Sequence, residues 1–242
     1  MMRRLLWSTL LLVSFALCAA AQTPAPSDRV FKLGDREVSI PPPEGFVEAA
    51  SRSAELRKFF EAAEAPMLDF LAAHIQAAVM EQFARGELPD LDFYTKVAVS
   101  KRLREVTYSR EEFSKLVATI SSDSPRLLDF DSPEMRALLK QQSKNVSAVI
   151  QEHMQASLSK AVSLGEIERT ANSYGRLSLT KVTTELGDTR QEKLLLSGGC
   201  AVLVRGRVVW VYTYKTFNSE RDADELRAFT KRWLAEILRA NS

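Results

Sequence analysis

The sequence predicts an α+β domain in which helices cover both faces of an antiparallel sheet, the arrangement called an α/β/α sandwich. Strand-like segments stand near both ends of the chain, with helix-like segments between and after them. After Gly165 the spacing of apolar residues changes from about 3.6 to about 2, which is typical of strands. Residues 200–217 are apolar on both sides, and such a strand pair must be covered on both faces. One side carries Leu203, Val208 and Trp210, and the other carries Val202, Val204, Val209 and Val211.

Residues 1–21 have the composition of an export signal peptide. Arg3-Arg4 precedes an apolar run over residues 5–17, and Ala19-Ala20-Ala21 supplies the small residues after which a signal peptidase cleaves. The run is too short to span a membrane. We therefore expect export through the general secretory route to the periplasm or the medium, with cleavage after Ala21.

Two other N-terminal signals fit these residues less well. A lipoprotein signal needs a small residue directly before its cysteine, but Leu17 precedes Cys18. A twin-arginine signal would export a prefolded cofactor protein, and no cofactor motif follows Arg3-Arg4. We expect no integral membrane segment once the signal is removed.

The charge balance argues against nucleic acid as a partner. The chain has 33 Lys and Arg residues and 31 Asp and Glu residues, and the signal removes Arg3 and Arg4, so the mature chain has no net charge. Nucleic acids and anionic membranes are bound through an excess of positive charge. We therefore expect neither as a partner.

Residues 22–29 are polar and contain proline, which is typical of a flexible linker, and residues 30–242 are expected to form a single α+β domain. This domain begins with a β-hairpin, because apolar residues alternate on both sides of Gly34-Asp35. Pro41-Pro42-Pro43 lacks the amide donors of a central strand, so the chain leaves the sheet there.

The segments 53–101 alternate between helix and strand patterns. Residues 53–65 have helical spacing that ends at Pro66, and the alternation in 93–101 predicts a strand. The stretch 67–83 leaves two interpretations open. Its apolar spacing fits a helix, whereas its apolar run at 70–75 fits a buried strand, and such runs do not separate the two states.

Two helix starts are marked by capping residues. Ser109 and Glu112 have the spacing of a capping box, so a helix is expected to follow. Ser132-Pro133 is a serine cap with proline at the first helical position. The apolar stripe of this second helix is expected to continue to Leu158, which places His153 and its neighbour Met154 on the helix.

The last third of the chain predicts strands and a closing helix. Turns are expected at Gly187-Asp188 and at Arg205-Gly206, and the second turn places Cys200 opposite Val211. Gly198-Gly199 is interpreted as a bulge or bend of the sheet, since no helix follows it as a phosphate-binding loop would require. The closing helix is expected over residues 220–240. Its buried face carries Leu226, Phe229, Trp233 and Ile237.

The order of these features resembles the PsbP-type α/β/α sandwich and a group of uncharacterised exported bacterial proteins. The features that carry the resemblance are Gly34, Ile40-Pro41, Gly45-Phe46, the segment 204–210 and the helix from Trp233 to Asn241. PsbP-type folds serve mainly as accessory or partner-binding modules. The resemblance implies such a role and gives no functional residue.

Few residues suggest chemistry. Cys200 is the one cysteine left after signal cleavage, so an intrachain disulfide is excluded. It opens an apolar strand, which favours a buried structural cysteine over a reactive thiol. His74 and His153 are the two histidines, and neither belongs to a cluster with metal-ligand spacing. We therefore assign no catalytic, cofactor-binding or metal-ligating residue and expect no cofactor.

The sequence is most consistent with a non-enzymatic accessory or partner-binding module of the cell envelope, whose partner is another envelope protein. One alternative is a small hydrolase or thiol enzyme that uses Cys200 or a carboxylate pair. In its histidine-dependent form, such an enzyme needs two of Cys200, His74 and His153 within hydrogen-bond reach in a cleft. The other alternative is a carrier of a small apolar ligand, which needs an enclosed cavity. The residues do not specify the ligand, the pathway or the oligomeric state.

Overall fold

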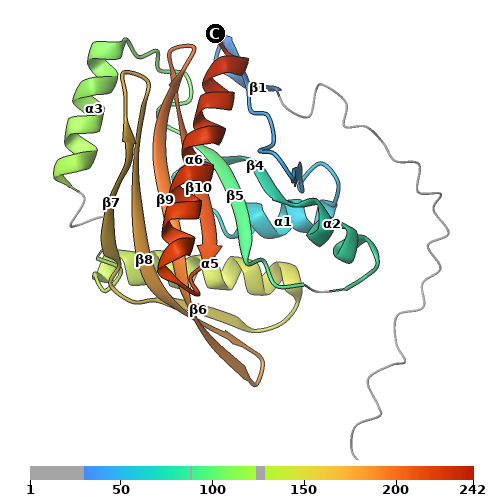
Figure 1. The fold of residues 1–242 in the computed structure, drawn as a ribbon. Helices are drawn as coiled ribbons and strands as arrows, with labels where there is room; N and C mark the ends of the chain where they lie inside the picture. The colour runs from blue at the N-terminus through green and yellow to red at the C-terminus, as the bar shows by residue number, and fades with distance from the viewer. Residues whose placement is uncertain (1–29, 88, 124–128) are drawn as a thin grey trace, which may run out of the picture.

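A computed structural model of the protein describes residues 30–87, 89–123 and 129–242. The export signal expected at 1–21 and the linker expected at 22–29 lie outside these residues. The described residues form an α+β fold with one large antiparallel sheet, a small hairpin and five helices, which confirms the predicted class (Figure 1).

Eight strands form the large sheet. Their order is β3-β4-β5-β10-β9-β8-β6, and β7 pairs with β8 along the same edge as β6. The strands are β3 (Phe46–Glu48), β4 (Leu68–Gln76), β5 (Phe93–Ser100), β6 (Met154–Leu158), β7 (Val162–Arg169), β8 (Ser173–Leu186), β9 (Thr189–Val204) and β10 (Arg207–Thr216).

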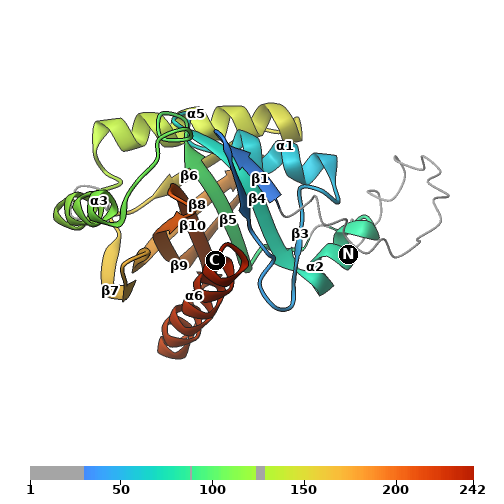
Figure 2. The same cartoon turned by 90° about the horizontal axis from the view of Figure 1, so that it is seen from above.

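The helices lie on both sides of this sheet (Figures 1 and 2). They are α1 (Ala54–Ala62), α2 (Ala77–Ala84), α3 (Arg110–Ser122), α5 (Pro133–Ile150) and α6 (Glu220–Ala240). Helix α3 begins with the predicted capping box, because Ser109 Oγ accepts from Glu112 N at 3.2 Å and Glu112 Oε2 accepts from Ser109 N at 2.7 Å.

One face of the sheet, here called the α6 face, packs against α6. Trp233 and Ile237 of α6 are buried in the same core cluster as Val209 and Val211 of β10. Trp233 Nε1 also donates to Pro41 O at 2.8 Å, which ties the helix to the segment after the hairpin. The hairpin of β1 (Val30–Leu33) and β2 (Arg36–Ser39) adds its buried side chains to the same core.

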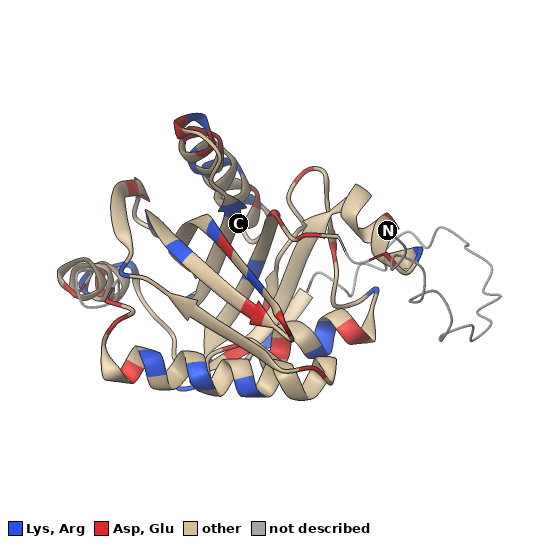
Figure 3. Ribbon diagram, turned by 90° about the horizontal axis from the view of Figure 1, so that it is seen from below, with Lys and Arg blue, Asp and Glu red and all other residues tan. Residues whose placement is uncertain are grey.

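The opposite face, here called the second face, is covered at two separate places. Near the turn between β9 and β10, Phe113 and Val117 of α3 pack against Tyr174 of β8. Near the other edge, Phe60 of α1 packs against Ile75 of β4. Helix α5 lies on this side of the sheet and spans the distance between α3 and α1 (Figures 2 and 3).

The ambiguous stretch 67–83 contains both predicted states in succession. Its first part is β4, a central strand whose middle is buried on both faces, and its second part is the short helix α2. The apolar spacing of the stretch was common to both interpretations, so only pairing with β3 and β5 separates them.

The long helix predicted to reach Leu158 is too long and ends at Ile150. Gln151 follows in the left-handed conformation with φ 57°, and 154–158 forms β6. Two serines of the helix hold this strand, since Met154 N donates to Ser147 Oγ at 2.9 Å and Ala156 N donates to Ser143 Oγ at 3.0 Å. The sheet therefore resumes at Met154, before Gly165.

The predicted bulge at Gly198-Gly199 is also wrong. The pairing of β9 with β8 and β10 continues through both glycines without a register shift. Gly198 is glycine for a different reason: a Cβ there would lie 2.4 Å from Thr213 Oγ1. The hydroxyl of Thr213 fills that space and pairs with Thr230 Oγ1 of α6 at 2.8 Å.

Candidate functional site

The three residues that could have formed a thiol or histidine centre are far apart. Cys200 of β9 and His74 of β4 both lie on the α6 face, with β10 and β5 between their strands. Three strand spacings of about 4.8 Å separate them by about 14 Å. His153 lies in the connection between α5 and β6. The structure therefore brings no two of them within hydrogen-bond reach.

Cys200 and His74 are core residues, and both are fully buried. The Cys200 Sγ sits where a Cβ at Gly175 would be, and burial raises the pKa of its thiol. The His74 ring contacts the Trp233 ring edge-on at 5.3 Å, and His74 Nδ1 pairs with Thr95 Oγ1 at 3.0 Å. The predicted burial of Cys200 is confirmed.

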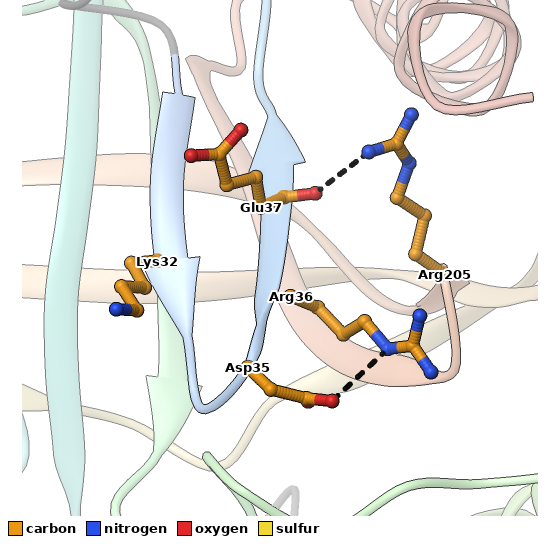
Figure 4. A pocket seen from close by; sticks show the side chains of 5 residues that line it. All are labelled: Lys32, Asp35, Arg36, Glu37 and Arg205. Atoms are coloured by element: carbon orange, nitrogen blue, oxygen red, sulfur yellow. Dashed lines mark hydrogen bonds and ion pairs between the residues drawn. The ribbon is translucent and has the colours of Figure 1, made fainter.

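A charged depression of about 710 Å³ lies beside the β1–β2 hairpin (Figure 4). Its lining residues mostly interact with one another or with the backbone. Arg205 Nη1 donates to Glu37 O at 3.3 Å, and Arg36 Nε lies 3.6 Å from Asp35 Oδ2. The pKa of Asp35 is lowered, mainly by its hydrogen bond to Arg207. The depression is open and is lined by three basic and two acidic side chains, of which Asp35 pairs with Arg36 and Arg207.

Arg207 is a buried arginine that contacts Asp35, one of the residues lining this depression. It is 3% exposed, and its guanidinium donates to Leu33 O, Glu105 O, Thr107 Oγ1 and Asp35. These acceptors belong to the hairpin and to the segment that precedes α3. Arg207 of β10 therefore links the hairpin and the segment before α3 to the sheet, which is a structural role.

The second face presents a different set of side chains. The strand register places Lys96, Tyr212, Gly199 and Arg176 in one row across β5, β10, β9 and β8. Cross-strand partners point to the same face of a sheet. We call this set the central row. It lies between the part of the face that α3 covers and the part that α1 covers.

The adjacent row brings two more tyrosines to this face. Tyr94 of β5 is the cross-strand partner of Tyr214 of β10, and their rings stack with centroids 4.7 Å apart. Tyr212 stacks beside Tyr214 at 6.3 Å, and Lys96 Nζ lies 5.3 Å from the centre of the Tyr212 ring. The three tyrosines and Lys96 therefore form one continuous cluster.

Glu64 joins this cluster from the loop after α1. It pairs with Lys96 at 3.1 Å, and the two side chains are only 5% and 14% exposed. Gln142 of α5 donates to Ala63 O at 2.8 Å, which attaches α5 next to this ion pair. The Lys96–Glu64 pair therefore lies at the point where α1, α5 and the sheet meet.

Gly199 leaves the middle of the second face uncovered. It lies on a central strand with partners on both sides, yet its backbone is exposed. A Cβ at Gly199 would contact only the Tyr212 ring, at 3.9 Å or more. Within 4 Å of such a Cβ, the Tyr212 ring is therefore the one neighbour among the described atoms beyond the adjoining residues, and Trp210 and Tyr212 are half-buried.

The tyrosines of this cluster are protonated at neutral pH, since tyrosine ordinarily ionises near pH 10. Burial raises the pKa of Tyr94, Tyr212 and Tyr214 further. Each can donate and accept a hydrogen bond. The arrangement can bind a ligand through rings, hydroxyls and cations. A nucleophile with an adjacent general base is not part of this set.

Sequence reasoning missed the central row. Trp210, Tyr212 and Tyr214 alternate along one strand, and this signal places them on one face. Their grouping with Lys96 and Arg176 depends on the register between distant strands. That register cannot be read from alternation alone.

Basic and acidic residues are interspersed along the helices and strands of the described part of the chain (Figure 3). Within 30–87, 89–123 and 129–242, no helix is long and apolar enough to cross a membrane, and no group of three His, Cys, Asp or Glu side chains could hold a metal ion.

No protein family model, curated protein or solved structure matched the chain.

Proposed function

We propose that this protein is a non-enzymatic accessory module of the cell envelope, and that the central row of the second face is its binding surface. The observation that carries this proposal is the exposed Gly199 in the middle of a sheet, beside the half-buried rings of Trp210 and Tyr212. An opening bordered by aromatic side chains is a common feature of binding sites.

The arrangement of candidate groups supports binding over catalysis. Cys200 and His74 are buried on the α6 face and are separated by two strands, so they do not support a thiol enzyme. Two carboxylates lie near the central row, and each already pairs with a cation. Glu64 pairs with Lys96, and Glu166 of β7 pairs with Arg169 at 2.6 Å. Neither Glu64 nor Glu166 is therefore a free carboxylate available for acid–base catalysis at the central row.

The fold and the N-terminus support the cellular part of the proposal. A sheet with α6 on one side and α1, α3 and α5 on the other is compatible with the PsbP-type sandwich that we propose for the domain. The export signal expected at 1–21 supports a periplasmic or secreted location. Mass spectrometry of exported protein should find Gln22, within a residue, at the N-terminus, and an uncleaved cytoplasmic chain would contradict export.

Another envelope protein is the proposed partner of the module. The central row lies between the two covered parts of the second face, so a small ligand reaches it more easily than a folded protein surface. The module would therefore contact its partner through a ligand held on the central row, or through the part of the second face that surrounds this row.

Complementation of a deletion strain tests binding against turnover. A triple variant, Cys200→Ala, His74→Gln and His153→Ala, removes the thiol and both imidazoles. Gly199→Leu instead places a large apolar side chain above the central row, at a position where the Cβ itself makes only ordinary contact with the Tyr212 ring. We expect the triple variant to restore the phenotype and Gly199→Leu to fail at equal protein level.

The opposite pattern would support an enzyme. If the triple variant folds by circular dichroism but does not restore the phenotype, while Gly199→Leu does, the binding proposal is wrong. Gly199→Ala is the matched control, since a methyl group adds little volume above the row.

A further inference from the structure

We propose that the central row binds a small organic anion with a flat apolar body, and that Arg176 is the residue that receives its charged group. This inference rests on the proposed function, because it names the ligand class of the same surface.

Arg176 is the cation of the central row without a carboxylate partner. Lys96 pairs with Glu64, and the nearby Arg169 pairs with Glu166. Glu166 is the cross-strand partner of Arg176, but its Oε1 is held by Arg169 Nη2 at 2.6 Å. Among the described residues, no acidic side chain lies within ion-pair distance of the Arg176 guanidinium. With Lys96 paired to Glu64, Arg176 is the cation of the row outside an ion pair, although its charge also acts on Glu166, whose pKa is lowered mainly by the hydrogen bond from Arg169.

The Arg176 side chain also has an unused buried donor. Its Nη2 donates to Ser163 Oγ at 2.9 Å, whereas its buried Nε has no hydrogen-bond partner in the part of the chain that the structure describes. Buried donors are almost always paired in folded proteins, so an unpaired one calls for an explanation. Because that Nε is buried, an anion accepts from the other N–H groups of the guanidinium, which match a carboxylate, sulfonate or phosphate.

The neighbouring positions fit the apolar part of such a ligand. Gly199 separates Tyr212 from Arg176 along the row and has no side chain. The Cα atoms of Tyr212 and Arg176 are therefore about 10 Å apart, two strand spacings, with a flat floor between them. The Tyr212 and Trp210 rings border this floor, and aromatic side chains bind planar apolar groups well.

The tyrosine hydroxyls add hydrogen bonds without adding negative charge. Tyr94, Tyr212 and Tyr214 are protonated at neutral pH, since tyrosine ordinarily ionises near pH 10 and burial raises the pKa of each further. They can therefore donate to acceptor groups of an anion and do not repel it. The remaining acid of the cluster, Glu64, is neutralised by Lys96.

Two matched probes test this inference on the exported protein. The first is 8-anilinonaphthalene-1-sulfonate, a flat aromatic anion, and the second is N-phenyl-1-naphthylamine, the same ring system without the sulfonate. Binding of each is followed by probe fluorescence and by calorimetry. We expect the anion to bind with one-to-one stoichiometry and more tightly than the neutral amine.

Three variants locate the site and identify the charge. Arg176→Gln should weaken binding of the anion by about tenfold or more, as loss of a charged hydrogen bond does, and leave the amine unchanged. Gly199→Leu should abolish binding of both probes. Arg190→Gln, at an exposed arginine on the outer part of β9, should change neither.

The outcomes separate this inference from the proposed function. If Gly199→Leu blocks both probes but Arg176→Gln weakens neither, the second face is a binding surface and the anion assignment is wrong. If neither probe binds, or if Gly199→Leu leaves binding unchanged in a folded variant, the central row is not the site. Either of these last two results would overturn the inference and the proposed function together.

Discussion

Gly198 and Gly199 are neighbours on β9, but they point to opposite faces of the sheet. A Cβ at Gly198 would lie 2.4 Å from Thr213 Oγ1 and 3.0 Å from Ile167 Cδ1, inside the core of the α6 face. We expect Gly198→Ala to lower the free energy of unfolding by about 1–3 kcal/mol, since overpacking forces the core to shift. Gly199→Ala should change it by less than about 1 kcal/mol. Thermal or urea unfolding measures both, and equal losses would contradict the opposite environments of the two glycines.

Arg207 and Arg205 form a second matched pair at the residue scale. Arg207 is buried and donates to the hairpin and to the segment before α3, whereas Arg205 is exposed on the turn. Hydrogen bonds to charged groups contribute about 1.5–3 kcal/mol each, so Arg207→Gln should lower stability by several kcal/mol. Arg205→Gln, an exposed change, should cost about 0.5 kcal/mol. Urea unfolding of both variants checks the prediction, and a small loss at Arg207 would show that the hairpin is held by packing alone.

The three tyrosines of the second face predict an alkaline transition. Their pKa values are raised in the folded protein, whereas tyrosine ionises near pH 10 in an unfolded chain. Above about pH 10 the folded state therefore binds more protons than the unfolded state, and stability falls as pH rises. Tyrosinate absorbance should show Tyr94, Tyr212 and Tyr214 titrating only as the protein unfolds. Tyr212→Phe should remove one late-titrating group, and ionisation of all tyrosines near pH 10 in a folded chain would contradict their burial.

Helix α6 is the element that closes the α6 face. Trp233 is 1% exposed and packs in the same cluster as β9 and β10, while Arg232 beside it is exposed. Replacing a buried Trp with Ala typically costs about 3–5 kcal/mol. We therefore expect Trp233→Ala to lower the melting temperature by many degrees and Arg232→Ala to leave it nearly unchanged. Similar melting temperatures for the two variants would mean that α6 is peripheral.

The elements that sequence reasoning recovered best are those with local signals. The capping box before α3, the Arg205-Gly206 turn and the spacing of α6 each lie within a few residues, and the structure confirms all three. The end of α5 could not be read in the same way. Apolar spacing continues past Ile150, and the strand beyond it is held by serine hydroxyls whose partners are set by the folded chain.

At the scale of the whole molecule, the sheet divides the side chains into two environments. The α6 face is closed by a long helix and contains Cys200 and His74, the residues that first suggested chemistry. The second face is covered at both sides and open at Gly199. The apolar residues on both sides of 200–217 predicted that helices lie on both faces of the sheet. The open centre of the second face depends instead on where α1, α3 and α5 lie. Those positions are set by long-range packing.

Amide chemical shifts of the labelled protein provide the most direct test of which surface binds. Addition of the aromatic sulfonate should shift the amides of Arg176, Gly199 and Tyr212 most strongly and leave the hairpin depression unchanged. If the largest shifts instead occur between Lys32 and Glu37 and at Arg205, the ligand occupies the charged depression of Figure 4, and the central row is not the binding surface.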